Sequence, residues 1–177
     1  MNPDLSSLET AFEGLLAAVV SSGSETPAGP EGGGPSCPPS GRCAPRVRRA
    51  EFGREGYHLE VQLRPDQVVE AARIADRFGF SIDAVTGVDW IKEGEMEVVY
   101  DFHHRLHGWR LVIRTRVPRQ QPELPSIHEV FPGANWHERE THEFFGIRFL
   151  GHRNLTPLLL PEDATYHPLR KDFQGAA

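Results

Sequence analysis

The side chains best suited to chemistry lie close together in the last third of the chain, where His137, Glu138, Glu140 and His142 fall within six residues. Imidazoles and carboxylates bind zinc, and the zinc-hydrolase motif HExxH places its histidines four residues apart, so that both project from one side of a helix. Here they are five residues apart, which separates them by roughly 140° at about 3.6 residues per turn. The spacing argues against a catalytic zinc. A free-standing metal-dependent enzyme using His137, Glu140 and His142 is a distant alternative.

Charge pairing along a helix offers another interpretation of this segment. Glu138 and His142 are spaced i, i+4, as are Arg139 and Glu143, and ion pairs at that spacing stabilise exposed helices. Alternatively, Glu138, Arg139 and Glu140 reach across a subunit interface, where a buried charge needs a partner. The residues by themselves leave both interpretations open.

Other candidate ligands have poorer spacing. Cys37 and Cys43 lie in a stretch of Pro, Ser and Gly without CxxC spacing, and two thiols cannot complete the four-ligand shell of a structural zinc or an iron–sulfur cluster. His103, His104 and His107 lie at an expected hairpin tip, where adjacent side chains point to opposite faces. The chain has no nucleophile elbow, phosphate-binding glycine loop or dinucleotide fingerprint. We therefore expect no catalytic residue, cofactor or metal in this chain.

Composition restricts the class of protein. The chain has 177 residues, 38% hydrophobic and 25% charged, which suits one domain with a core plus appendages. No apolar run approaches the roughly 20 residues of a membrane span. The net charge of −6 argues against a general nucleic-acid binder. Because acidic residues rather than basic ones precede the first apolar stretch, no secretion signal is expected, and the sequence indicates a cytosolic protein.

The first 45 residues divide into two parts. Residues 1–20 have apolar side chains at helical intervals, which predicts an amphipathic N-terminal helix. Residues 21–45 are dominated by Gly, Pro and Ser, which predicts a flexible linker. The helix is therefore expected on a tether, from which it can dock on this domain, on a partner or on neither.

Residues 46–150 have the pattern of an α+β domain. Alternation of apolar and polar residues predicts a strand at residues 57–63, and the 3.6-residue period predicts a helix at residues 65–79. Residues 80–88 predict a second strand, closed by a turn at residues 86–89. Alternation before and after residues 103–108 predicts a hairpin. We expect a largely antiparallel sheet covered by a helix on one face.

Regular patterns become sparse after Pro118. Prolines break up the chain, and Asn135 is suited to cap a short helix that begins at Trp136. Residues 151–177 are rich in Pro and charge and contain only scattered leucines. Such a tail is hard to stabilise alone, so we expect it to lie extended on another surface as a docking tail.

Blocks in this order resemble the 30-kDa subunit family of NADH-quinone oxidoreductase, which is respiratory complex I. They span roughly residues 55–173, and the ERE, FGI, GH and PLRKDF blocks are highly specific. The resemblance implies an α+β fold and a non-catalytic, cofactor-free subunit of the peripheral arm. The complex would transfer electrons from NADH, or from another donor, to quinone and couple this to ion translocation. The blocks are Thr86-Gly87-Val88-Asp89, Val98-Val99-Tyr100, Pro125-Ser126-Ile127, Asn135-Trp136, Glu138-Arg139-Glu140, Phe145-Gly146-Ile147, Gly151-His152, Leu160-Pro161-Glu162-Asp163 and Pro168-Leu169-Arg170-Lys171-Asp172-Phe173.

The resemblance also implies partners and a location. The protein is expected beside the large subunit that borders the quinone site and near its iron–sulfur neighbour, on the cytoplasmic side of the cell membrane. Iron–sulfur clusters, flavin and quinone are expected in partner subunits. The residues expected at the partner interface are Trp136, Glu138, Arg139, Glu140, His152, Arg170, Lys171 and Asp172.

Departures from the family pattern leave a related alternative open. His142 and Glu143 stand where quinone-reducing relatives have an aromatic residue followed by Asp, and the family's Arg pair after the GH block is missing near Thr156 and Pro157. In this respect the chain is similar to the homologous subunit of energy-converting, membrane-bound nickel–iron hydrogenases. That alternative implies a nickel–iron centre in the large partner subunit.

Overall fold

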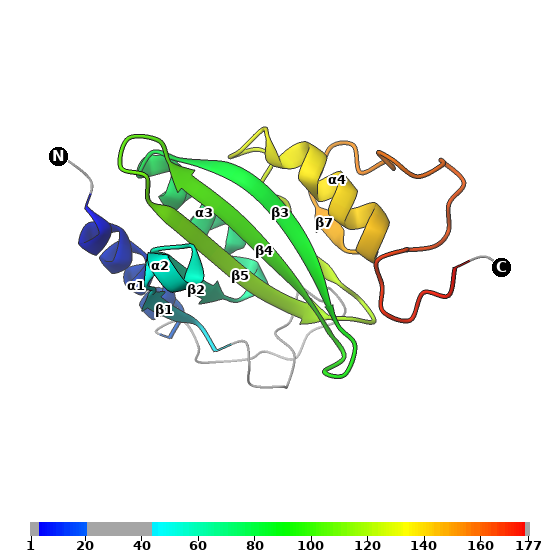
Figure 1. Ribbon diagram of the computed structural model, residues 1–177, viewed down its shortest axis with the longest axis horizontal. Helices are drawn as coiled ribbons and strands as arrows, with labels where there is room; N and C mark the ends of the chain where they lie inside the picture. The colour runs from blue at the N-terminus through cyan, green and yellow to red at the C-terminus, as the bar shows by residue number, and fades with distance from the viewer. Residues whose placement is uncertain (1–3, 21–43, 176–177) are drawn as a thin grey trace, which may run out of the picture.

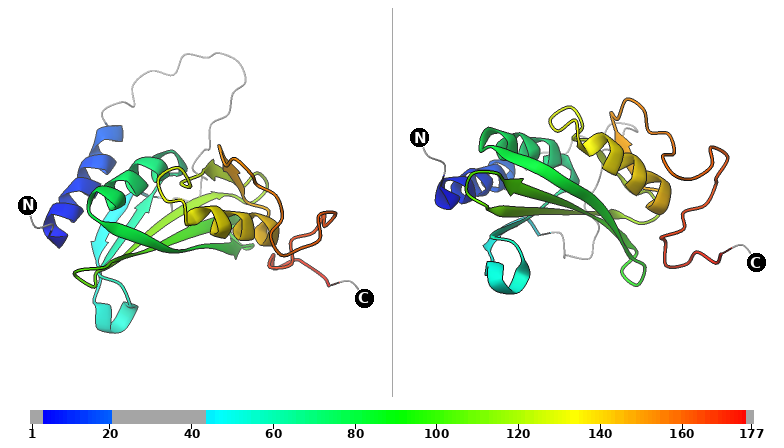
Figure 2. Two further views of the ribbon diagram at one scale, coloured as in Figure 1. Left: turned by 90° about the horizontal axis from the view of Figure 1, so that it is seen from above. Right: turned by 45° about the horizontal axis from the view of Figure 1, so that its top comes forward.

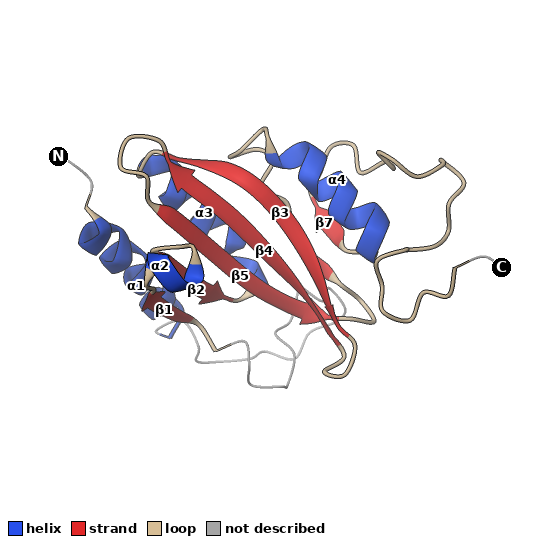
Figure 3. Ribbon diagram, viewed as in Figure 1, coloured by secondary structure: helices blue, strands red, loops and turns tan. Residues whose placement is uncertain are grey.

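The computed structural model describes residues 4–20 and 44–175, so most of the predicted linker, with Cys37 and Cys43, lies outside the described residues. A five-stranded sheet in the order β1-β2-β5-β4-β3 forms its centre (Figures 1 and 3). Strands β2 and β5 are parallel, and the other adjacent pairs are antiparallel. The predicted α+β class with a largely antiparallel sheet is therefore confirmed. The strands are β1 (Arg46–Arg49), β2 (Leu59–Leu63), β3 (Phe80–Trp90), β4 (Glu95–His104) and β5 (Arg110–Pro118).

The longer helices lie on one side of this sheet, as the view from above in Figure 2 shows. They are α1 (Leu5–Val20), α3 (Val68–Arg77) and α4 (Ala134–Phe145), while the short α2 (Phe52–Glu55) lies near the β1 edge. A 3-10 turn at Pro65–Gln67 leads into α3, and a small parallel pair, β6 (Glu123–Pro125) and β7 (Arg148–Leu150), lies beside α4. Among the described residues, no helix has the length and apolar content to cross a membrane.

The core lies between the sheet and the helices. Strand alternation buries Leu59, Val61 and Leu63 of β2 on this side. The N-terminal helix α1 adds Leu8 and Phe12, both fully buried, and it contacts α3, β1 and β2. The N-terminal helix therefore docks on its own domain, which is one of the positions considered from the sequence.

Two local predictions are wrong. Residues 86–89 form no turn but continue β3, where Thr86 pairs with Val99 and Asp89 pairs with Met96 of β4. The glycine in this stretch serves packing instead, because a Cβ on Gly87 would come within 2.6 Å of the Phe145 ring. Helix α4 begins at Ala134, so Asn135 is its second residue and not its cap. The short elements β1, α2, β6 and β7 were not predicted.

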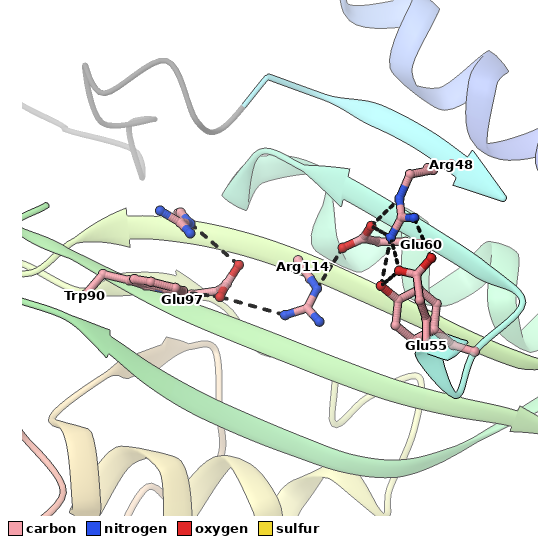
Figure 4. Close-up of polar contacts among 8 residues, drawn as sticks. Arg48, Glu55, Glu60, Trp90, Glu97 and Arg114 are labelled. Carbon is pink, nitrogen blue, oxygen red and sulfur yellow. Dashed lines mark hydrogen bonds and ion pairs between the residues drawn. The ribbon is translucent and has the colours of Figure 1, made fainter. Parts of the chain in front are cut away.

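The sheet face without the long helices carries a ladder of alternating charges, shown in Figure 4. The Glu60 carboxylate pairs with Arg48 at 2.6 Å and with Arg114 at 2.9 Å. The Glu97 carboxylate lies 3.8 Å from the Arg114 guanidinium and 3.5 Å from that of Arg116. A cavity of about 440 Å³ adjoins the ladder. Alternation predicted a polar face here, but the Glu60–Arg114 pair joins β2 to β5, which lie far apart in the sequence.

Candidate functional site at helix α4 and the C-terminal segment

Helix α4 presents two buried carboxylates that bind backbone N–H groups. Glu138 is fully buried, and its Oε1 accepts the N–H of Ile127 at 2.8 Å while its Oε2 accepts the hydroxyl of Ser126. Burial raises the pKa of Glu138 to about 7, although these two hydrogen bonds act in the opposite direction. His142 does not pair with Glu138, because its Nδ1 contacts the carbonyl of Ile147 at 2.8 Å. The i, i+4 ion pair considered from the sequence is therefore not formed.

Glu143 and Arg139 hold the first part of the C-terminal segment, residues 151–175, against the helix. The Glu143 carboxylate accepts the N–H groups of Leu158, Leu159 and Leu160 at 2.7–3.1 Å. Arg139 donates to the carbonyls of residues 156 and 157, each at 2.9 Å, and to a threonine hydroxyl at 3.2 Å. The side chains that were considered as partners of each other instead form a clamp on residues 156–160.

The end of α4 is capped by later residues of the same segment. His167 Nδ1 contacts the carbonyl of Glu143 at 2.8 Å, and Arg170 Nε donates to the carbonyl of Phe145 at 2.7 Å. Helix C-termini leave carbonyls without intrahelical partners and attract positive charge. Gly146 ends the helix at φ 74°, and the segment passes so close that a Cβ there would lie 2.5 Å from Arg170 Nη2.

Asp89 at the end of β3 fixes the last part of the segment. Its carboxylate accepts two hydrogen bonds from Arg119 at 2.8 and 3.0 Å and the N–H of Lys171 at 2.8 Å. Arg119 also donates to Asp172 at 2.6 Å. Burial raises the pKa of Asp89, but the hydrogen bonds and the positive charges outweigh it, so the pKa lies below its usual value. From the sequence, Asp89 belonged only to a family block, and its role as an anchor was not predicted.

The outer side of α4 and the C-terminal segment exposes large apolar side chains. Trp136 is 62% exposed, and Leu159 and Leu169 are 66% and 53% exposed. Tyr166 and Phe173 stack on each other with ring centroids 5.6 Å apart and are also exposed. Large apolar side chains exposed along one helix and the segment that it holds are typical of a surface that binds another protein. We call these five residues the apolar surface.

The residues expected at a partner interface have different environments. Glu138 and the His152 side chain are buried, whereas Trp136 is exposed. Arg139, Arg170 and Asp172 bind groups of their own chain, as described above. Glu140 lines a cavity of about 240 Å³ between β3 and α4 together with His137. The structure thus brings all eight residues to α4 and the C-terminal segment, where some face outward and some hold the segment in place.

The imidazoles and carboxylates considered for a metal-dependent enzyme are not brought together. Among the described residues, the group close enough to share a metal ion is His128, Glu138 and His152. His137, Glu140 and His142 are not in that group. His128 was not recognised from the sequence, because it lies in an irregular turn far from the other two residues along the chain.

The chain is similar to subunits of several membrane oxidoreductases. It is 41% identical over 120 residues to an NADH-quinone oxidoreductase subunit of Roseiflexus castenholzii, covering 64% of this chain and 68% of that one. It is 44% identical over 93 residues to an F(420)H(2) dehydrogenase subunit of Methanosarcina mazei, covering 52% of this chain and 59% of that one. A chain of the membrane-bound sulfane sulfur reductase, an archaeal respiratory membrane complex, superposes with a TM-score of 0.64 at 29% identity, over 73% of this chain and 77% of that chain.

The family model for the respiratory-chain NADH dehydrogenase, 30 Kd subunit, matches residues 61–177. These residues include β3, α4 and the C-terminal segment, whose contacts are described above. The predicted family is confirmed: the chain belongs to the 30 Kd subunit family of respiratory-chain NADH dehydrogenase, as a subunit of a complex I-type membrane oxidoreductase and a member of a multisubunit respiratory complex.

Proposed function

We propose that this protein is a non-catalytic docking element of the peripheral arm, which binds the large quinone-site subunit through α4 and the C-terminal segment. The observation that carries the proposal is the apolar surface, whose large side chains are exposed although the backbone beneath them is firmly held. A prearranged surface loses little conformational entropy on binding. The segment is therefore suited to recognise a partner that presents a complementary apolar face.

The charged residues expected at the interface have two roles in this proposal. Arg139, Arg170 and Asp172 shape the segment from within, while Glu140 and the Lys171 ammonium supply polar contacts around the apolar surface. Iron–sulfur clusters, flavin and quinone belong to the partner subunits, and this chain contributes none of these three. The peripheral arm with this subunit lies on the cytoplasmic side of the membrane, and the complex couples electron transfer to ion translocation.

The electron donor is set by other subunits in this proposal. The donor in this proposal is NADH or another reductant. The similarity to subunits of an F(420)H(2) dehydrogenase and a sulfane sulfur reductase supports the same docking role with other substrates. The nickel–iron hydrogenase alternative has a simple test in the gene for the large subunit that neighbours this one. Nickel-binding cysteine pairs in that subunit would favour the hydrogenase, and their absence would favour the quinone-reducing complex.

Co-purification with the large subunit tests the docking role. Leu169→Glu replaces one exposed side chain of the apolar surface with a charge and should sharply reduce recovery of the large subunit from cells that express both. Leu106→Glu is the matched control, because Leu106 is 88% exposed in the β4–β5 turn, at the end of the sheet away from the C-terminal segment. Equal recovery with both variants would contradict docking through this surface.

A further inference from the structure

We propose that His128, Glu138 and His152 form a binding site for one divalent transition-metal ion of the zinc type. The three residues come from the turn after β6, the inner side of α4 and the turn after β7, and one ligand atom of each lies within 4.8 Å of the others. The side chains of Glu138 and His152 are fully buried, and the side chain of His128 is 9% exposed. Neither the docking surface nor the clamp on the C-terminal segment accounts for two imidazoles beside one buried carboxylate.

His128 has an unused nitrogen in this cluster. Its Nδ1 lies 2.8 Å from the hydroxyl of Ser126, and that hydroxyl donates to Glu138. The Ser126 oxygen therefore accepts a hydrogen bond from Nδ1, which leaves the lone pair of His128 Nε2 free. This buried Nε2 has no hydrogen-bond partner. Its near neighbour is the carboxylate of Glu129 at 3.2 Å, in a geometry that forms no hydrogen bond. A cation is attracted both by the lone pair of Nε2 and by the negative charge of the carboxylate that it faces.

The ligand types and distances suit a zinc-type ion. Two neutral imidazoles and one carboxylate form a three-ligand set found in zinc sites, with bonds of about 2.0–2.2 Å. A tetrahedral ion at those distances holds its ligand atoms roughly 3.3–3.5 Å apart. His152 Nε2 and Glu138 Oε2 are 3.9 Å apart, so a small rotation closes the set. Glu129 lies outside this three-residue group, and its carboxylate pairs with Arg153 at 2.8 Å.

Two contacts of His152 must change when the ion binds. Its Nε2 faces the carbonyl of Asn135 at 3.3 Å, and its Nδ1 accepts the N–H of Asn154 at 3.2 Å. Ligation through Nε2 moves the ring proton to Nδ1, so the contact with Asn154 has to open. Asn154 is exposed in a turn, where this rearrangement disturbs no core packing. A cavity of about 380 Å³ lined by His128, Glu129 and Asn135 borders the cluster at His128.

Zinc titration of the full chain tests the site. The background variant is Cys37→Ser/Cys43→Ser, which removes the chain's two thiols, and the untagged protein is first stripped with a chelator. Calorimetry with zinc chloride should give one ion per chain. His128→Ala should weaken binding by more than about 100-fold, because loss of an outer-shell partner alone costs about 10- to 100-fold. Substituted with cobalt, the background protein should show the visible absorption of a tetrahedral site.

The control is His103→Ala/His107→Ala, which removes two imidazoles from the β4–β5 hairpin and should leave zinc affinity unchanged. A second readout separates binding from folding: zinc should raise the melting temperature of the background protein but not that of His128→Ala, since a ligand stabilises the state that binds it. Absence of a one-to-one site, or equal affinity in the background protein and His128→Ala, would overturn the proposal. Loss of zinc binding in His103→Ala/His107→Ala but not in His128→Ala would also overturn the proposal.

Discussion

Glu143 stabilises the C-terminal segment through three backbone N–H groups and not through a side-chain partner. The sequence suggested Arg139 as its partner one helical turn earlier, which is a local pattern. Three amide donors from the chain after β7 compete successfully for the same carboxylate, because a charged acceptor forms strong hydrogen bonds with several donors at once. Sequence spacing does not predict this outcome, since it depends on where a segment without regular structure passes.

Replacing Glu143 with Gln should loosen residues 156–160 without unfolding the domain. A hydrogen bond to a charged group contributes about 1.5–3 kcal/mol, compared with about 0.5–1.5 kcal/mol for a neutral one. We expect faster tryptic cleavage after Arg153, by about tenfold for each 1.4 kcal/mol of local stability lost. Glu140→Gln on the same helix is the control and should be cleaved at the rate of the parent protein. Equal rates for both variants would show that Glu143 does not hold the segment.

Asp89 should make the anchoring of residues 170–172 sensitive to acid. Its folded pKa lies below the ordinary value of 3.8, because Arg119 and the Lys171 N–H outweigh the effect of burial. The unfolded chain therefore binds more protons in this range, so the stabilisation is complete above about pH 4 and is lost as the pH falls through the folded pKa.

The free energy of unfolding, measured by urea between pH 6 and pH 2.5, should decrease less steeply at low pH in Asp89→Asn than in the parent. Asp163→Asn, an exposed acid of the C-terminal segment, should follow the parent. An unchanged pH profile for Asp89→Asn would exclude this anchor as the source of acid sensitivity.

At the scale of elements, the end of α4 depends on a glycine for two separate reasons. Gly146 has φ 74°, where an L side chain is strained, and the segment that contains His167 and Arg170 passes directly over it. Gly151 has a similar φ of 81° but has open space around its Cβ position. A comparison of substitutions at Gly146 and Gly151 therefore distinguishes the effect of backbone strain from the effect of the close approach of the C-terminal segment.

Gly146→Ala should destabilise the protein more than Gly151→Ala. The left-handed conformation costs roughly 1–2 kcal/mol for a residue with a side chain, and both variants bear that cost. Only Gly146→Ala also displaces His167 and Arg170, so its C-terminal segment should become susceptible to trypsin. Urea unfolding and limited proteolysis of the two variants measure the two effects. Equal losses of stability with equal protease resistance would contradict the contact over Gly146.

Some elements were predicted correctly and others were not, because some depend on residues within one segment and others depend on contacts between segments far apart in the sequence. Periodicity within one segment was sufficient for α1, α3, the hairpin of β4 and β5 and the α+β class. It could not give the parallel pairing of β2 with β5, which joins segments about fifty residues apart. The glycine in residues 86–89 looked like a turn, although it makes room for Phe145. Likewise, His128 joined the metal-type cluster only through the packing of two turns against α4.

At the scale of the whole molecule, the N-terminal helix and the C-terminal segment complete the domain at opposite ends, as Figure 1 shows. Helix α1 places Leu8 and Phe12 in the same core as α3, and Arg49 of β1 pairs with Glu9 at 2.7 Å. The C-terminal segment is held mainly by polar contacts and keeps apolar side chains exposed. The N-terminal end is thus built for stability within the chain, and the C-terminal end is built for association.

Leu8→Ala should therefore lower the stability of the isolated chain even though the helix precedes the family-matched region. Removal of a fully buried leucine costs about 2–5 kcal/mol, because the cavity left behind closes only partly. Leu106→Ala, at an exposed leucine, should change the free energy of unfolding by less than about 0.5 kcal/mol. Urea denaturation of both variants and the parent gives the comparison. If Leu8→Ala unfolds at the same urea concentration as the parent, α1 does not contribute to the core in solution, and its docking on α3 would have to be abandoned.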